Sequence, residues 1–286
     1  MKKLLSFLYA ITIALSSFAT GQQADLLFID GEKWILLGRP VYADSVLYNS
    51  LIDILPKGRS ITTANWDGFQ GYWSIRNDWL ILDSICVSFW DKDTHQYWQE
   101  SIPSADMHRV FGEFYDKDSI VATWLTDTIR IGKGEQIYYM HDGFERNHEY
   151  EQLVAIKEGH MTGRQSYHNR VVVDGFSLSG LKRDVIKSKF PLDFNSCSEI
   201  DGMKTVIFNI GDILLDSLGN MIDCRVRAII PGSDPEQKNP QCLEKLGNDM
   251  KQLLKSISPW KTLFINGEYV PETKHGFFLP YRIGDN

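Results

Sequence analysis

The hydrophobic pattern of the chain changes near residues 174–180, in the segment Asp-Gly-Phe-Ser-Leu-Ser-Gly, and this change most restricts its possible folds. Before it, short runs rich in aromatic and β-branched residues alternate with turn residues, which is typical of strands. After it, apolar residues recur at helical spacing in two segments, with strand-like runs between and after them. We therefore expect an α+β protein, with a mostly antiparallel β domain at residues 25–179 and a small α+β domain at residues 181–286.

The first region contains a clear hairpin pattern. Tyr72–Ile75 and Trp79–Ile85 read as strands joined by a turn at residues 76–78. A similar unit follows, with Ser119–Trp124 and Thr128–Ile131 as its strands, and Gly132–Gly134 is expected to turn the chain again. Further strands are expected at Gln136–Met140, Tyr150–Ile156 and Arg170–Val173, and a helical turn or two within Ser104–Tyr115.

The N-terminus has the pattern of a secretory signal peptide. Lys2 and Lys3 precede an apolar run at residues 4–19, and small residues follow it at suitable cleavage positions. We assign residues 1–21 to the signal and expect a mature chain that begins near Thr20 or Gln22, in the periplasm or outside the cell. An uncleaved anchor is the alternative. No later segment is apolar enough to predict a membrane span.

Composition bears on the class of partner. The net charge is -7, and Lys and Arg do not gather in a stripe, so nucleic acid is not an expected partner. The four cysteines, Cys86, Cys197, Cys224 and Cys242, are an even number in an exported chain, which permits disulfides but does not choose their pairing. One structural bridge or buried free thiols are both compatible with their irregular spacing.

No catalytic motif is present. The chain lacks HExxH, G-x-S-x-G, a P-loop and a dinucleotide fingerprint, so we assign no catalytic residue and no cofactor and favour a binding protein over an enzyme. His141 and His148 are the nearest approach to a metal-binding pair, but a solvated loop explains them as well, and no metal site is assigned.

Tryptophan is concentrated in the first region, which contains seven of the eight. Packing in a sheet core is the expected role of most of them. Trp66 lies among polar and glycine residues at 65–71 and is the candidate for an exposed aromatic loop. Exposed indoles could also stack on sugar rings, beside a carboxylate pair drawn from five acidic residues. Carbohydrate binding or carbohydrate chemistry in this domain is therefore the alternative function. The five are Asp67, Asp83, Asp91, Glu100 and Glu113.

The second region has an ordered series of motifs. A helix at Leu181–Lys189 ends at Phe190-Pro191, strands flank a turn at residues 218–220, and a helix at Cys242–Ile257 follows. Pro259-Trp260-Lys261, a turn at residues 266–268 and a last strand at Phe277–Ile283 complete the series. In order and spacing it resembles the C-terminal domain of TonB-type energy transducers, over about a third of the chain.

The resemblance implies a protein-binding module. Domains of this kind bind a receptor segment as an added strand at a sheet edge. It implies a contact on the last strand, with an envelope or outer-membrane protein as the partner, and an exported, non-enzymatic binding or scaffold protein as the function. Closure of this edge by the first domain is the alternative. The chain lacks the long Pro-rich spacer of the transducers, so coupling to the proton-motive force is not expected. The implied contact residues are Phe277, Phe278, Leu279, Tyr281 and Arg282.

Overall fold

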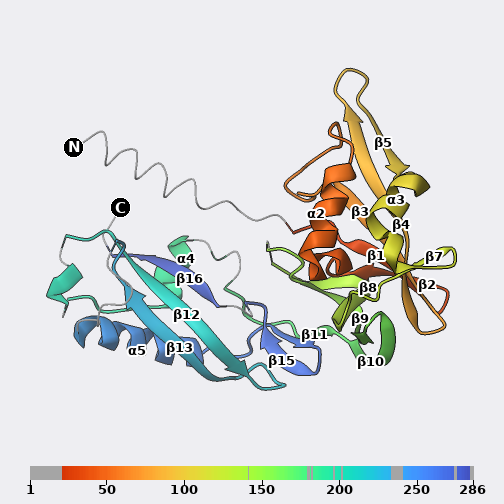
Figure 1. Ribbon diagram of the computed structural model, residues 1–286. Helices are drawn as coiled ribbons and strands as arrows, with labels where there is room; N and C mark the ends of the chain where they lie inside the picture. The colour runs from red at the N-terminus through yellow and green to blue at the C-terminus, as the bar shows by residue number, and fades with distance from the viewer. Residues whose placement is uncertain are drawn as a thin grey trace. The chain divides into compact units, whose positions relative to one another are not determined.

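The computed structural model describes residues 21–140, 142–178, 181, 183–195, 197–200, 202–232, 241–273 and 276–283 (Figure 1). The protein is a β-rich α+β chain that divides into two compact units, the first ending at His168 and the second beginning at Asn169. The division precedes the change of pattern at residues 174–180 because the strand at Arg170–Val173 pairs within the second unit. Residues 1–20, which make up all but the last residue of the predicted signal (1–21), lie outside the described residues, as do His141, Ser179 and Gly180.

The first unit is built on one ten-stranded sheet. Its strands follow the order β10-β9-β8-β2-β1-β3-β4-β7-β6, β5 pairs with β4, and β10 also pairs with β4 through His160 and Trp79. All pairings are antiparallel except that of β1 with β3. The strands are β1 (Asp25–Ile29), β2 (Glu32–Leu36), β3 (Phe69–Arg76), β4 (Trp79–Asp91), β5 (Gln96–Ser101), β6 (Tyr115–Asp116), β7 (Ser119–Val121), β8 (Asp127–Tyr139), β9 (Arg146–Lys157) and β10 (His160–His168).

Two α-helices cover the core of this sheet. α3 (Ser104–Phe111) confirms the helical turns expected there, whereas α2 (Ser45–Ile54) was not predicted. The side chain of Asp44 accepts hydrogen bonds from two backbone amides in the first turn of α2, and Leu47 and Leu51 are buried. Short 3-10 turns occur at Pro40–Ala43 and Gly112–Phe114.

The strand predictions for this unit had mixed outcomes. The hairpin at residues 72–85 is confirmed, with Asn77 and Asp78 in the positive-φ turn between β3 and β4. The prediction of a second hairpin, between Ser119–Trp124 and Thr128–Ile131, is wrong. β7 pairs with β4 and β6, whereas β8 pairs with β9 and β2. The turn at Gly132–Gly134 is also wrong, because β8 continues through it and a register shift between Lys133 and Gln136 absorbs the irregularity.

A buried ionic centre lies within the first unit, around Arg39. Its guanidinium donates to the carboxylate of Asp67 and lies 3.6 Å from that of Asp25, and both Arg39 and Asp25 are buried. The hydroxyls of Tyr42 and Tyr48 also donate to Asp67. A buried ion is tolerated only with such partners, so the centre fixes the relative positions of three segments that are far apart in sequence.

Asp25 makes the stability of the first unit depend on pH. Burial raises the pKa of its carboxyl to about 6, although Arg39, the Gly71 amide and the Trp73 indole lower it in part. In the folded state the Asp25 carboxyl therefore stays protonated at pH values at which the unfolded chain has already lost this proton. The Asp25 contribution to stability is greatest below about pH 4 and is lost as pH rises through about 6, a change of about 3 kcal/mol.

We expect this component to vanish in Asp25→Asn, because the amide does not titrate. The measurement is the free energy of unfolding of both proteins between pH 4 and 7.5, and the change with pH should be larger in the wild type. A carboxyl midpoint below about 4, measured by NMR on Asp25, would contradict the prediction.

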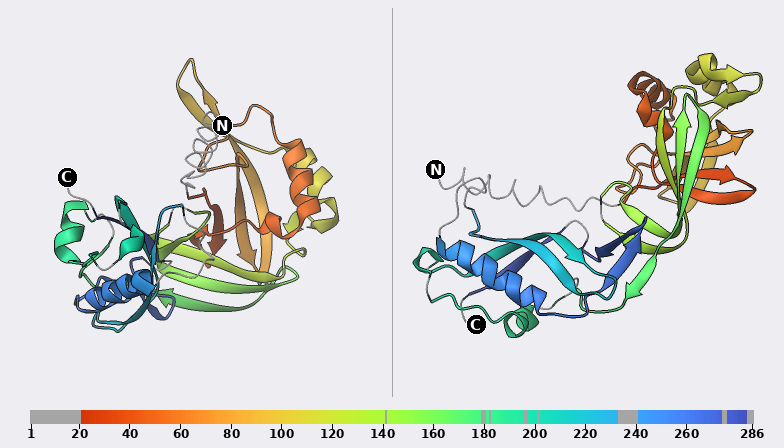
Figure 2. Two further views of the ribbon diagram at one scale, coloured as in Figure 1. Left: turned by 90° about the vertical axis from the view of Figure 1, so that its left-hand side faces the viewer. Right: turned by 90° about the horizontal axis from the view of Figure 1, so that it is seen from below.

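The second unit contains two three-stranded sheets, in the orders β11-β14-β15 and β13-β12-β16. α4 and α5 confirm the two predicted helices, and α5 lies along β12 and β13 (Figure 2). The core of the second unit combines Leu246, Met250 and Leu254 of α5 with Val206 and Phe208 of β12. The elements are α4 (Arg183–Lys189), a 3-10 turn at Ser198–Ile200, α5 (Gln241–Lys255), β11 (Arg170–Val173), β12 (Thr205–Leu215), β13 (Met221–Ile229), β14 (Thr262–Ile265), β15 (Glu268–Pro271) and β16 (Phe277–Arg282).

A disulfide in the second unit joins Cys197 to Cys242, which are 45 positions apart in sequence. Cys242 lies in the first turn of α5, so the bridge ties the start of this helix to the segment before β12. Cys224 is a buried free thiol and Cys86 a half-buried one. The sequence left the pairing open, and the fold resolves it. Over the described residues, none of the helices has the length and apolar character of a membrane span.

Candidate functional site

β16 is an edge strand. It pairs antiparallel with β12 from Phe277 to Arg282, and no described strand pairs with its other side. Pro280 lies in its middle, opposite Ile207. Proline is accommodated at such an edge because its missing N–H removes no bond to the neighbouring strand when the nitrogen faces outward. The predicted last strand at a sheet edge is therefore confirmed.

The side chains of β16 alternate between the core and the surface. Leu279 and Tyr281 are buried, and the hydroxyl of Tyr281 donates to the carbonyl oxygen of Phe190 over 2.8 Å. Burial raises the pKa of Tyr281, which keeps this donor protonated. Phe278 has 65% of its surface exposed, and Arg282 is exposed as well, whereas Phe277 is half-buried. The predicted contact residues thus divide, and the side chains of Leu279 and Tyr281 belong to the core.

The backbone of β16 follows the same alternation. The amide of Ile283 donates to the carbonyl of Lys204 over 3.1 Å, which extends the pairing by one position beyond Arg282. In an antiparallel pair, bonded and non-bonded residues alternate, so the backbone groups of Phe278, Pro280 and Arg282 point away from β12. The open edge therefore offers two N–H donors separated by a proline that has none.

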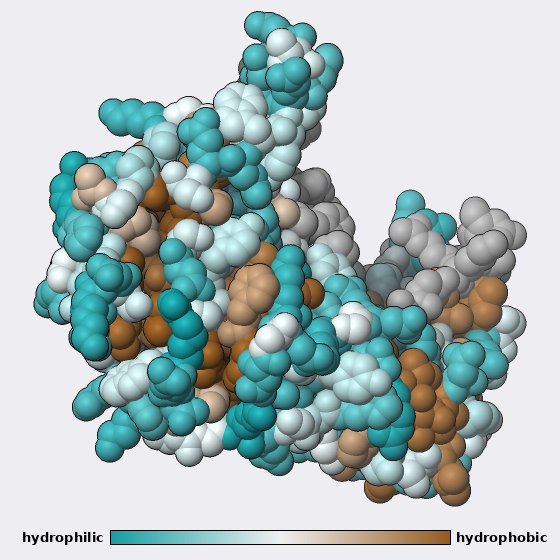
Figure 3. Space-filling model, turned by 90° about the vertical axis from the view of Figure 1, so that its right-hand side faces the viewer, coloured by the Kyte–Doolittle hydropathy of each residue, from teal (hydrophilic) through white to brown (hydrophobic). Residues whose placement is uncertain are grey.

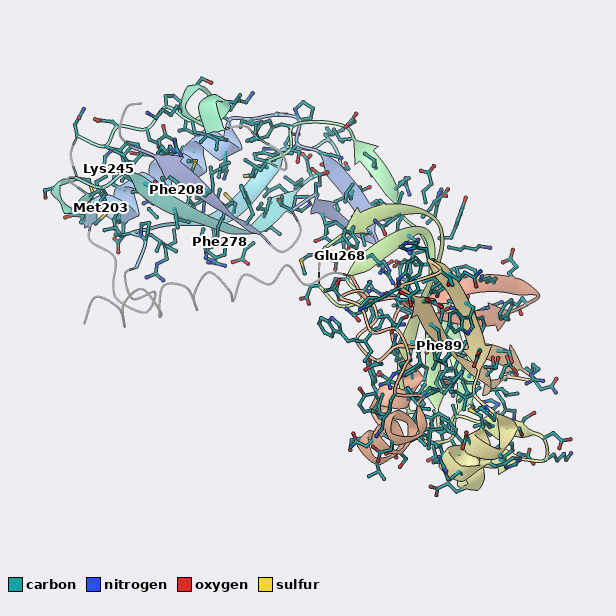
Figure 4. All side chains as sticks on the ribbon, turned by 90° about the horizontal axis from the view of Figure 1, so that it is seen from above. Phe89, Met203, Phe208, Lys245, Glu268 and Phe278 are labelled. Carbon is teal, nitrogen blue, oxygen red and sulfur yellow. A yellow bond between two sulfur atoms is a disulfide. The ribbon has the colours of Figure 1, made fainter. Side chains whose placement is uncertain are left out.

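The sheet face beside this edge is apolar and basic. Phe278 and Phe208, labelled in Figure 4, come from neighbouring strands, but Phe208 is buried in the core and Phe278 is not. Ile207 and Ile229 are cross-strand partners that alternate with core residues, so they lie on the same open face as Phe278. Register places Arg227 opposite Asn209, which itself pairs with Phe278. Sequence reasoning missed the β12 and β13 positions, although their alternation indicated them.

Trp66 lies in the first unit, whereas β16 belongs to the second. Its side chain is 57% exposed, as expected for an aromatic loop residue. Two hydrogen bonds restrain the backbone of the loop around Trp66. Arg59 Nε donates to the Asp67 carbonyl over 2.7 Å, and the Gly68 amide donates to the Asn65 side chain over 3.1 Å. The loop thus presents a large aromatic side chain on a fixed backbone.

The other tryptophans of the first unit divide between core and surface. Trp34 and Trp73 are buried and Trp124 is half-buried, as packing predicts, but Trp79, Trp90 and Trp98 are exposed. Trp90 and Trp98 belong to the β4–β5 arm, whose hydrophilic tip is visible at the top of Figure 3. Their strand positions place them on opposite faces of the arm, so they do not form one stacking platform.

The five carboxylates considered for a catalytic pair each have a separate set of partners. Asp67 belongs to the buried ionic centre, Asp83 pairs with Arg76, and Asp91 accepts amides of its own turn. Glu100 accepts the Trp98 indole N–H, and Glu113 lines a pocket together with Trp79. No group of three or more His, Cys, Asp or Glu side chains within the described part of the chain is arranged to hold a metal ion.

His148, the described member of the histidine pair, is buried. Its backbone amide donates to the Glu151 carboxylate over 2.9 Å, and its ring lies 3.4 Å from the Gly134 carbonyl. Burial lowers the pKa of His148, which favours the neutral imidazole. The solvated-loop interpretation is therefore wrong for His148, which has a packing role within β9.

Comparison with protein-family models, with curated proteins and with solved structures found no match for this chain.

Proposed function

We propose that the protein is an exported, non-enzymatic binding protein whose second unit, a TonB C-terminal-like module, holds an extended segment of an envelope protein. The observation that carries this proposal is the outer edge of β16, with which none of the described strands pairs, together with the 65% exposure of Phe278. Backbone donors and acceptors give affinity to an added strand, and alternate side chains give it specificity. An outer-membrane protein is the partner that the family resemblance favours.

The chemistry of the open face defines the segment that would bind. Phe278, Ile207 and Ile229 offer an apolar surface, and Arg282 adds a positive charge at the end of the strand. A segment with an aromatic or branched apolar residue and a nearby carboxylate complements both features. Pro280 removes the central donor of the edge, so the added strand is expected to bond at its two ends.

Site-specific photo-crosslinking in intact cells tests the contact. A photoreactive phenylalanine analogue in place of Phe278 should give a defined adduct with one envelope protein. The matched control places the same analogue at Ile222, an exposed apolar residue of β13 in the same unit, and should give none. Adducts of equal yield at both positions, or at neither, would contradict the proposal.

Point variants then measure the contribution of the edge. With the captured partner, Phe278→Ala should weaken binding by about tenfold to a hundredfold, because a few exposed aromatic side chains dominate such interfaces. Ile222→Ala is the control of similar exposure and should leave the affinity unchanged. The affinity of the purified proteins, measured by calorimetry, separates these outcomes.

A further inference from the structure

A pocket in the first unit contains one of the exposed indoles. It has a volume of about 550 Å³ and is lined by Trp79 and by residues of the β3–β4 turn, β6 and β7. Small-molecule sites have volumes of roughly 300–1,000 Å³. Among the exposed indoles of the described residues, Trp79 lines this pocket, whereas Trp66, Trp90 and Trp98 do not.

Two apolar residues at the base of the lining, Ile81 and Val121, are buried. Ile81 of β4 pairs directly with Val121 of β7. Trp79 precedes Ile81 by two positions on the same face of β4, and its side chain is 40% exposed. The imidazole of His160 packs against the indole at 82°, with ring centroids 4.9 Å apart. This contact fixes the position of the indole while part of its surface remains open.

The rim carries both signs of charge. Arg76 is held by Asp83, 2.7 Å away, and by a 3.1 Å hydrogen bond to the Ser74 hydroxyl. Glu113, Asp116 and Asp118 are exposed carboxylates of the same lining, and the exposed Lys117 lies between the last two in sequence. Such a rim offers donors and acceptors together, beside the two buried apolar residues.

We propose that this Trp79 pocket binds a pyranose unit of a neutral oligosaccharide. A pyranose with equatorial hydroxyls presents a flat face of axial C–H groups to an indole and a ring of hydroxyls that both donate and accept. A cationic ligand would meet Arg76 and Lys117, and an anionic ligand would meet three carboxylates. The neutral polyol is the ligand for which each charged group of the rim is a hydrogen-bond partner.

This inference stands apart from the protein-binding function. It uses residues of the first unit only, whereas the proposed protein contact uses β16 of the second. Loss of sugar binding with an intact Phe278 crosslink would therefore refute this inference alone. Loss of the crosslink with intact sugar binding would refute the other.

Calorimetric and saturation-transfer NMR titrations of the full mature chain test the pocket. The probes are cellohexaose, chitohexaose and maltohexaose, with tetramethylammonium as the cationic comparison. At least one oligosaccharide should bind with a Kd below roughly 10 mM, and Trp79→Ala should weaken that binding by about tenfold or more. Trp98→Ala, which removes an indole of nearly the same exposure (42% against 40%) outside the pocket, should leave the affinity unchanged.

A second variant guards against a folding defect in Trp79→Ala. Glu113→Ala removes an exposed rim carboxylate and should weaken sugar binding by about fivefold, whereas Glu113→Gln, which keeps a hydrogen-bonding oxygen, should weaken it less. Failure of all three oligosaccharides to bind overturns the proposal. So does binding that Trp79→Ala and Glu113→Ala leave intact, or binding of tetramethylammonium alone.

Discussion

Replacing Arg39 with methionine should lower the free energy of unfolding of the first unit by about 3–5 kcal/mol, because it leaves two buried carboxylates without their cation. Methionine is unbranched and uncharged, so the substitution removes the charge and the hydrogen bonds of Arg39 while it keeps an apolar side chain in the buried site. Arg39→Lys should also destabilise the unit, since one ammonium cannot reproduce the guanidinium contacts with Asp67, Asn65 and the Phe69 carbonyl. Tryptophan fluorescence is the appropriate measurement, because seven of the eight tryptophans precede residue 125.

The matched control is Arg76→Met. Arg76 also pairs with an aspartate, Asp83, but the arginine side chain is 54% exposed, so the same substitution should cost less than about 1 kcal/mol. The Arg39→Met loss should also shrink at pH 5, where Asp25 is protonated and needs no cation. Equal losses in the two variants would show that the buried centre contributes no more than a surface pair.

Removing the Cys197–Cys242 disulfide should destabilise the second unit by about 4 kcal/mol, the value that loop-closure entropy gives for cysteines 45 residues apart. The double variant Cys197→Ser/Cys242→Ser tests this, with chemical unfolding followed by the hydrogen exchange of α5 and β12. Their amides should exchange faster, while those of β3 and β4 in the first unit stay protected.

Reduction of the wild-type protein should lower its stability as much as the double substitution does. Reduction of the double variant itself should have no further effect. Cys86→Ser is the control, because Cys86 is a half-buried thiol whose contact is a 3.4 Å hydrogen bond to Ser101. It should cost less than about 1 kcal/mol. A loss of similar size in Cys86→Ser, or none in the double variant, would be inconsistent with a stabilising bridge.

The second unit was the more predictable from sequence, because its elements carry strong local signals. α5 has a single apolar face at helical spacing, and Gly219 provides the positive φ of the β12–β13 turn. The first unit gave fewer such signals. β10 has no buried residue and is mostly polar, so no alternation marks it, and β8 contains glycines that a bulge rather than a turn explains. α2 could have been found from its Asp44 cap.

The candidate sites were only partly visible in the sequence for a similar reason. The β16 edge follows from its terminal position and Pro280, and the alternation of its side chains separates Phe278 from Leu279. The Trp79 pocket depends on the pairing of β4 with β7 and β10, which no local pattern encodes. The same holds for the ionic centre, because Asp25, Arg39 and Asp67 meet only after the sheet has formed.

Pro280 also bears on self-association. An unpaired strand edge can template the addition of identical chains, one after another, and this is the usual route from an open sheet to a fibril. Every copy added at β16 would lack one backbone hydrogen bond at Pro280, because proline has no N–H to donate. The same bond would be missing between each pair of added strands. The edge is therefore suited to one partner segment that tolerates the missing bond, and it resists indefinite growth from copies of itself.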